Sequence, residues 1–335
     1  MAYRIGYCSL AATKRFLQTK SSLQHVRYFT ISHRRWNDMP LNQSMNVFDR
    51  STKLAQRDRA AKAINFSDYD YLREEVADRI ADRSFDIKRF FPVAVDLGCG
   101  RGYIGKYLDK EVIGTLVQCD HSKESLKIAQ MRAASFEVPA ISVIADEEFI
   151  PFPDHSVDLL FSSLSLHWIL ACLKNDGAFI GAMFGGDTLY ELRCSLQLAE
   201  IERKGGFAPR VSPFADVRDV GNLLTRAGYT LTTIDLDDII VNYPSMFELL
   251  DDLKGMGESN AAWSRTNILH RDTMMAAASI YKAMYGNDDG SVPATFRVIS
   301  WIAWKPDKSQ TQPAERGSAT ISMKDLSASD SRKGS

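Results

Sequence analysis

The sequence predicts an α/β protein built on a mostly parallel sheet with helices on both faces. Three observations predict this class. Short apolar runs alternate with helical segments across residues 92–186, and this alternation is typical of parallel sheets. The run 157–164 is apolar at five of its eight positions, a content that favours a strand buried on both faces. A glycine-rich turn, "DLGCGRG", follows the first apolar run.

The elements of the first half follow in order. Two segments, 46–63 and 68–85, show helical spacing with heavily charged faces. The N-terminal helical region ends at Pro92, and the first strand begins after it. The core is then expected to contain strands at 93–97, 116–119, 141–145, 157–164 and 177–185, with a helix at 122–134 whose first residue carries a hydroxyl.

The second half has a different pattern, with longer segments. We expect helices at 187–203, 212–227, 244–254 and 272–285, and strands at 229–243, with a turn at Asp237-Asp238, and at 294–304. The predicted organisation is N-terminal helices at 45–91, a nucleotide-binding core at 92–186, a C-terminal part at 187–305 and a flexible polar tail at 306–335.

The N-terminus has the composition of a targeting segment. The first 36 residues carry seven Lys or Arg, seven Ser or Thr and no acid, which predicts a mitochondrial transit peptide over residues 1–40. The remaining residues carry 34 bases and 42 acids, a balance that gives no general attraction for nucleic acid. The sequence has no run of 18 apolar residues, and its five cysteines form no CxxC pair. These patterns indicate neither a membrane span nor a zinc site.

The glycine turn indicates a ligand site. Gly98, Gly100 and Gly102 remove side chains where a ligand could approach the backbone, and Asp96 precedes them at the end of the first strand. Two alternatives remain at this point. A dinucleotide site is compatible with the spacing GxGxxG, which Gly100 and Gly102 begin, and a purely structural turn needs no ligand.

Two further strands are also expected to end in acids. Asp120 follows the second strand, where a carboxylate can bind ribose hydroxyls. Asp146 and Glu147 follow the third, where an acid can accept a hydrogen bond from an adenine amine. Acids at three successive strand ends beside one glycine turn favour a ligand that contains adenosine.

This arrangement resembles the S-adenosylmethionine-dependent methyltransferases of class I, which have a Rossmann-like fold. The resemblance runs through "VDLGCGRG", "ADEEFIPFPDHSVDLLFSSLSLHW" and "LKNDGAFIGAMF". It implies that the turn from Asp96 to Gly102 holds the methionine part of S-adenosylmethionine, that Asp120 holds the ribose, and that Asp146 with Glu147 holds the adenine.

The remainder of the chain narrows the resemblance. "VNYPSMFELLDDLKGMGES", "ILHRDTM" and "PAERGSAT" are similar to a family of mitochondrial complex I assembly factors that have a methyltransferase fold and hydroxylate arginine. The resemblance implies a matrix enzyme that is peripheral on the inner membrane. Its implied partners are an iron–sulfur subunit of complex I and other assembly factors, and its implied co-reactant is molecular oxygen.

The residues themselves do not explain a hydroxylation. Non-haem iron needs two histidines and a carboxylate at one metal, and the pair His270 and Asp272 is followed by no histidine. We therefore assign no catalytic residue and no metal ligand. Two alternative functions stay open: a methyltransferase acting on a small molecule or a carrier-bound acid, and an assembly chaperone without catalysis.

One segment departs from the family pattern. Only "ILACLKNDG" separates Trp168 from Ala178, where the family has a full helix, so about ten residues, or roughly three helical turns, are absent. A parallel crossover usually needs a dozen residues or more.

We predict that inserting a helix of about ten residues between Trp168 and Ala178 raises the melting temperature, because the helix would cover apolar surface on one face of the sheet. Thermal unfolding of the two forms checks this. Equal melting temperatures would contradict it.

Overall fold

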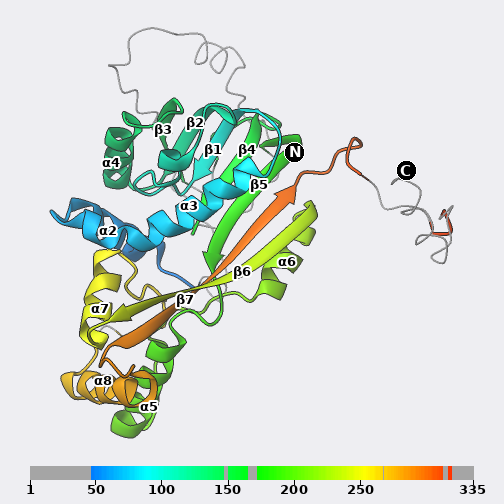
Figure 1. Ribbon diagram of the computed structural model, residues 1–335. Helices are drawn as coiled ribbons and strands as arrows, with labels where there is room; N and C mark the ends of the chain where they lie inside the picture. The colour runs from blue at the N-terminus through cyan, green and yellow to red at the C-terminus, as the bar shows by residue number, and fades with distance from the viewer. Residues whose placement is uncertain (1–46, 147–149, 165–171, 267, 312–315, 319–335) are drawn as a thin grey trace, which may run out of the picture. The chain divides into compact units, whose positions relative to one another are not determined.

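The computed structural model describes residues 47–146, 150–164, 172–266, 268–311 and 316–318. All of them belong to one compact unit, residues 39–335. Its centre is a seven-stranded sheet in the order β3-β2-β1-β4-β5-β7-β6 (Figure 1). The transit peptide predicted at residues 1–40 lies outside the described residues and stays a prediction.

Five parallel strands form the first part of the sheet and confirm the predicted core. They are β1 (Phe91–Leu97), β2 (Ile113–Asp120), β3 (Ala140–Ile144), β4 (Val157–Ser163) and β5 (Leu173–Phe184). The long strands β6 (Thr230–Tyr243) and β7 (Val292–Trp304) complete the sheet, and β7 runs antiparallel to both β5 and β6. The carboxyl ends of β1 and β2 lie together because Leu97 pairs with Cys119.

Helices cover both faces of the sheet, as predicted. Helix α3 (Tyr71–Phe85) and the short helix η3 (Ile104–Tyr107) bury one apolar cluster, to which Ile80, Phe91 and Phe161 belong. Helix α4 (Lys123–Ala133) packs against β2, β3 and η3. Helix α6 (Val217–Arg226) packs its Val220 and Leu224 into a second cluster on the opposite face. Burial of this much apolar surface is the main stabilising contribution to the fold.

A third cluster holds the C-terminal helices against the sheet. Helices α5 (Tyr190–Lys204), α7 (Met246–Gly255) and α8 (Arg271–Tyr285) pack with Phe296 of β7 and with Leu72 of α3 (Figure 1). Helix α2 (Arg50–Lys62) precedes them all in sequence. Its Asp58 accepts a hydrogen bond of 2.5 Å from Ser122, which is the N-cap residue of α4. The N-terminal helices are therefore anchored beside the end of β2.

Two local predictions are wrong. Helix α6 begins at Val217 instead of residue 212, because Asp216 and Asp219 form a capping box that starts it. The turn predicted at Asp237-Asp238 is absent, because β6 continues through both residues. Arg297 of β7 binds both carboxylate oxygens of Asp238, at 2.7 and 2.9 Å, and this pairing accommodates the acid within the strand.

The connection between β4 and β5 spans residues 164–172, of which 165–171 lie outside the described residues. His167 and Trp168 are among them. The effect predicted for the shortened crossover therefore stays a prediction. No helix among the described residues has the length and hydropathy needed to cross a lipid bilayer.

The chain beyond the predicted boundary at residue 305 makes defined contacts. The side-chain amide of Gln310 donates to Asp176 at 3.0 Å, and its oxygen accepts from Thr230 at 2.9 Å. The C-terminal part thus continues at least to this residue.

Candidate functional site

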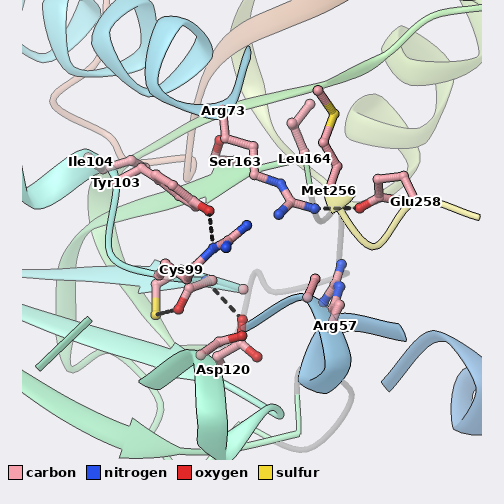
Figure 2. Close-up of a pocket in the computed structure, with 15 residues that line it drawn as sticks. Arg57, Arg73, Cys99, Tyr103, Ile104, Asp120, Ser163, Leu164, Met256 and Glu258 are labelled. Atoms are coloured by element: carbon pink, nitrogen blue, oxygen red, sulfur yellow. Dashed lines mark hydrogen bonds and ion pairs between the residues drawn. The ribbon is translucent and has the colours of Figure 1, made fainter. Parts of the chain in front are cut away.

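The glycine turn after β1 adopts a conformation that favours glycine. Gly98, Gly100 and Gly102 have φ values of 67°, 56° and 77°, which lie in the left-handed region that other residues rarely adopt. A recess with an empty volume of about 580 Å³, including space open to solvent, lies beside the turn (Figure 2). Gly98 and Gly100 line it. Gly102 does not line it, because the position of its missing Cβ is only 2.7 Å from the Gln118 amide.

Asp120 ties the glycine turn to the end of β2. One carboxylate oxygen accepts a hydrogen bond from the Gly100 N–H at 2.9 Å, and the other accepts from the Ser122 N–H at 2.7 Å. Asp120 is buried and lines the recess. The second predicted acid is therefore at the site, held by two backbone amides.

Asp96 is a buried carboxyl without a partner. It is fully buried, and neither carboxyl oxygen has a hydrogen-bond partner among the described residues. Burial, and secondarily the charge of Asp120, raises the pKa of Asp96 to about 8. A carboxyl in this state favours an incoming hydrogen-bond donor, and a cationic one most of all. Asp96 lies directly before the turn but does not line the recess.

The third predicted acid has a protein partner. Asp146 follows β3 and forms an ion pair of 2.7 Å with Arg50 at the start of α2. It is not among the residues that line the recess. Glu147 lies outside the described residues. The structure thus brings Asp96 and Asp120 together at the turn and engages Asp146 with the N-terminal helix.

The opposite wall of the recess was not predicted from the sequence. It consists of side chains from α2, α3 and the loop after α7, namely Arg57, Ala60, Arg73, Met256 and Glu258. Arg73 donates to Glu258 at 2.6 Å (Figure 2). The signals in the sequence were the charged faces of the first two helices and the stretch "KGMGES". Neither signal predicts which of these charged side chains line the same recess.

The end of β4 forms another part of the wall. Ser163 and Leu164 both line the recess. Leu164 has φ of 56°, a left-handed conformation that is strained for leucine. Strained residues of this kind concentrate at ligand sites.

A buried network of hydrogen bonds and ion pairs holds the glycine turn in place. The Arg101 Nε donates to the Tyr103 hydroxyl at 2.7 Å, and this hydroxyl donates to Asp70 at 2.8 Å. The Arg101 guanidinium also forms an ion pair of 2.8 Å with Asp70, and Arg132 of α4 binds the other oxygen of Asp70 at 2.6 Å. Arg101 therefore shares the Asp70 carboxylate with Arg132, whereas Arg57 and Arg73 contribute guanidinium groups to the opposite wall.

Comparison with known proteins places this site in a family. Residues 95–181 match the model of a methyltransferase domain. The human protein "arginine-hydroxylase NDUFAF5, mitochondrial" is 56% identical over 294 residues, which cover 85% of this chain and 84% of the human one. The chain belongs to the NDUFAF5 family. The zebrafish (Danio rerio) member is 55% identical over 304 residues and covers 88% of this chain and 94% of its own length.

The NDUFAF5 family also has more distant methyltransferase relatives. A malonyl-[acyl-carrier protein] O-methyltransferase from Halorhodospira halophila is 33% identical over 258 residues, which cover 73% of this chain and 84% of the bacterial protein. The sheet order and the domain match together give the Rossmann-like class I methyltransferase fold, as the sequence predicted.

We predict that Asp96→Asn changes the pH dependence of stability. The carboxyl has a pKa of about 8 in the folded protein and of about 3.9 in the unfolded chain. Between these values the folded state binds more protons, so this group lowers stability as pH rises, by up to about 1.4 kcal/mol per pH unit. The asparagine variant should lose this dependence.

Urea unfolding between pH 5 and pH 8 measures the effect. The free energy of unfolding of Asp96→Asn should rise relative to that of the unmodified protein as pH increases. Glu111→Gln, at an exposed carboxyl, is the control and should run parallel to the unmodified protein. A parallel curve for Asp96→Asn would contradict the prediction.

Proposed function

We propose that this protein is a mitochondrial arginine hydroxylase that acts as an assembly factor of respiratory complex I. The observation that carries the proposal is the 56% identity to the human arginine hydroxylase over 85% of the chain. The proposed substrate is an arginine of an iron–sulfur subunit at an early assembly stage. The proposed location is the matrix face of the inner membrane, with other assembly factors as further partners and no nucleic acid.

We assign S-adenosylmethionine to this recess as the bound cofactor. Gly98 and Gly100, which line the recess, would hold the chain of the methionine part, and the buried Asp96 behind the turn, which has no hydrogen-bond partner among the described residues, would hold its amino group. Asp120 would hold the ribose hydroxyls. The adenine is assigned to the region of Asp146 and Glu147. S-adenosylmethionine supplies an activated methyl group when bound. Gly102 would support the site by letting the turn pack against α4, because Ala129 is 3.0 Å from the position of its missing Cβ.

The hydroxylation itself requires molecular oxygen and a source of two electrons. Among the described residues, no three His, Cys, Asp or Glu side chains are grouped so that they could hold a metal ion. We propose roles in binding and orienting the reactants for the residues that line the recess. Among them, Asp120 would hold hydroxyl groups of the ligand.

A conventional methyl transfer is the second candidate. The methyltransferase domain match and the 33% identity to a malonyl-[acyl-carrier protein] O-methyltransferase favour it. Its expected product carries a methyl group instead of an oxygen atom.

Mass spectrometry of the treated subunit separates these functions. The purified iron–sulfur subunit is incubated with the protein, S-adenosylmethionine and oxygen in a mitochondrial matrix extract. The extract supplies the reductant and is first depleted of its own copy of the protein. We expect one arginine to gain one oxygen atom. Asp120→Asn should reduce this product at least about tenfold, because it removes a charged hydrogen-bond acceptor, whereas Glu111→Gln should not.

A methyl group on the product would contradict hydroxylation and establish the second candidate. Tight binding of the subunit without modification would instead support a chaperone without catalysis.

A further inference from the structure

The described part of the recess wall contains two carboxylates with different kinds of partner. Asp120 is held by the backbone N–H groups of Gly100 and Ser122, which cannot move without the glycine turn. Glu258 is held by the side chains of Lys53 and Arg73. Figure 2 shows the Arg73–Glu258 pair on the side of the recess away from Asp120. Only Glu258 can therefore exchange its partners without a change in the turn.

The backbone places Glu258 firmly at the recess. Its N–H donates to the Leu253 carbonyl at 2.9 Å and closes the end of α7. The preceding Gly257 has φ of 76°, and the position of its missing Cβ is 3.2 Å from Ala60 and from the Gln56 carbonyl on α2. A side chain at Gly257 would push the loop away from α2, so the glycine brings the carboxylate to the wall.

Glu258 remains ionised and already binds a guanidinium. Partial burial opposes its ionisation, but the charges of Lys53, Arg73 and Arg57 lower its pKa to about 2. The Arg73 guanidinium lies 2.6 Å from one carboxylate oxygen. The Tyr103 side chain also lies close enough to interact with the charge of Arg73. Arg73 therefore has another polar neighbour when it leaves Glu258.

We propose that Glu258 binds the guanidinium of the protein substrate's arginine, and that Arg73 occupies this position until the substrate enters. The inference rests on the proposed hydroxylase function and names the residue that recognises its substrate. One guanidinium replaces another at the same carboxylate, so the charge of the pair is unchanged. Carboxylates bind guanidinium groups with directional, charge-assisted hydrogen bonds, and such binding presents the side chain in a fixed orientation.

Two variants with opposite expected effects test the proposal. The affinity of the mature full-length protein for the purified iron–sulfur subunit is measured by biolayer interferometry, and its affinity for S-adenosylmethionine by calorimetry. Glu258→Gln should weaken binding of the subunit about tenfold or more, because a charge-assisted hydrogen bond is lost. It should change the affinity for S-adenosylmethionine less than threefold.

Arg73→Gln should strengthen binding of the subunit, because it removes the internal competitor for Glu258. A merely structural role of the Arg73–Glu258 pair would weaken binding in both variants. Glu202→Gln, at an exposed carboxylate of α5, is the matched control and should change neither affinity. Circular dichroism and melting temperatures establish that each variant is folded.

Equal binding of the subunit by Glu258→Gln and the unmodified protein would overturn the proposal, as would unchanged or weaker binding by Arg73→Gln. Absence of subunit binding by the unmodified protein would overturn it too. If the subunit binds through Glu258 but gains no oxygen, the hydroxylase function fails and the assignment of Glu258 stands.

Discussion

The hydrogen bond from the Gly100 N–H to Asp120 is the interaction on which the site depends. It joins the turn after β1 to the end of β2, and the Cys99 N–H strengthens the join by donating to the Cys119 carbonyl at 2.9 Å. Three glycines in the left-handed region would otherwise leave the turn many conformations, because glycine restricts the backbone least. The register of the two strands and this carboxylate select one conformation, and the recess opens beside it.

The described lining of the recess carries charges of both signs. Asp120 lies on the turn side, with the buried Asp96 behind the turn, and the opposite wall contributes the guanidinium groups of Arg57 and Arg73 around one carboxylate, Glu258. The same charge pattern requires the N-terminal helices to be in place, because α2 and α3 supply both arginines.

The sequence predicted what depends on local pattern. Apolar runs located the five parallel strands, and the spacing of Asp96, Gly98 and Asp120 located the turn, because these residues lie at the ends of neighbouring strands. The opposite wall could not be predicted, because Arg57 and Glu258 are remote in the chain and meet only through tertiary packing. The same limit explains the false turn at Asp237-Asp238.

Two consecutive acids such as Asp237 and Asp238 are typical of turns, but Arg297 on the neighbouring strand β7 neutralises Asp238 and lets β6 continue. Asp146 shows the converse, since its position after a strand was predicted and its partner, Arg50, was not.

Calorimetric titration with S-adenosylmethionine at pH 7, in two buffers with different ionisation enthalpies, tests the central claim most directly. The claim is that the polar ends of β1 and β2 form a ligand site that includes Asp96. Since the pKa of Asp96 is about 8 before binding, an incoming ammonium should displace its proton, with release of about one proton per ligand. The Asp96→Asn protein should release none. No binding, or equal proton release by both proteins, would contradict the account.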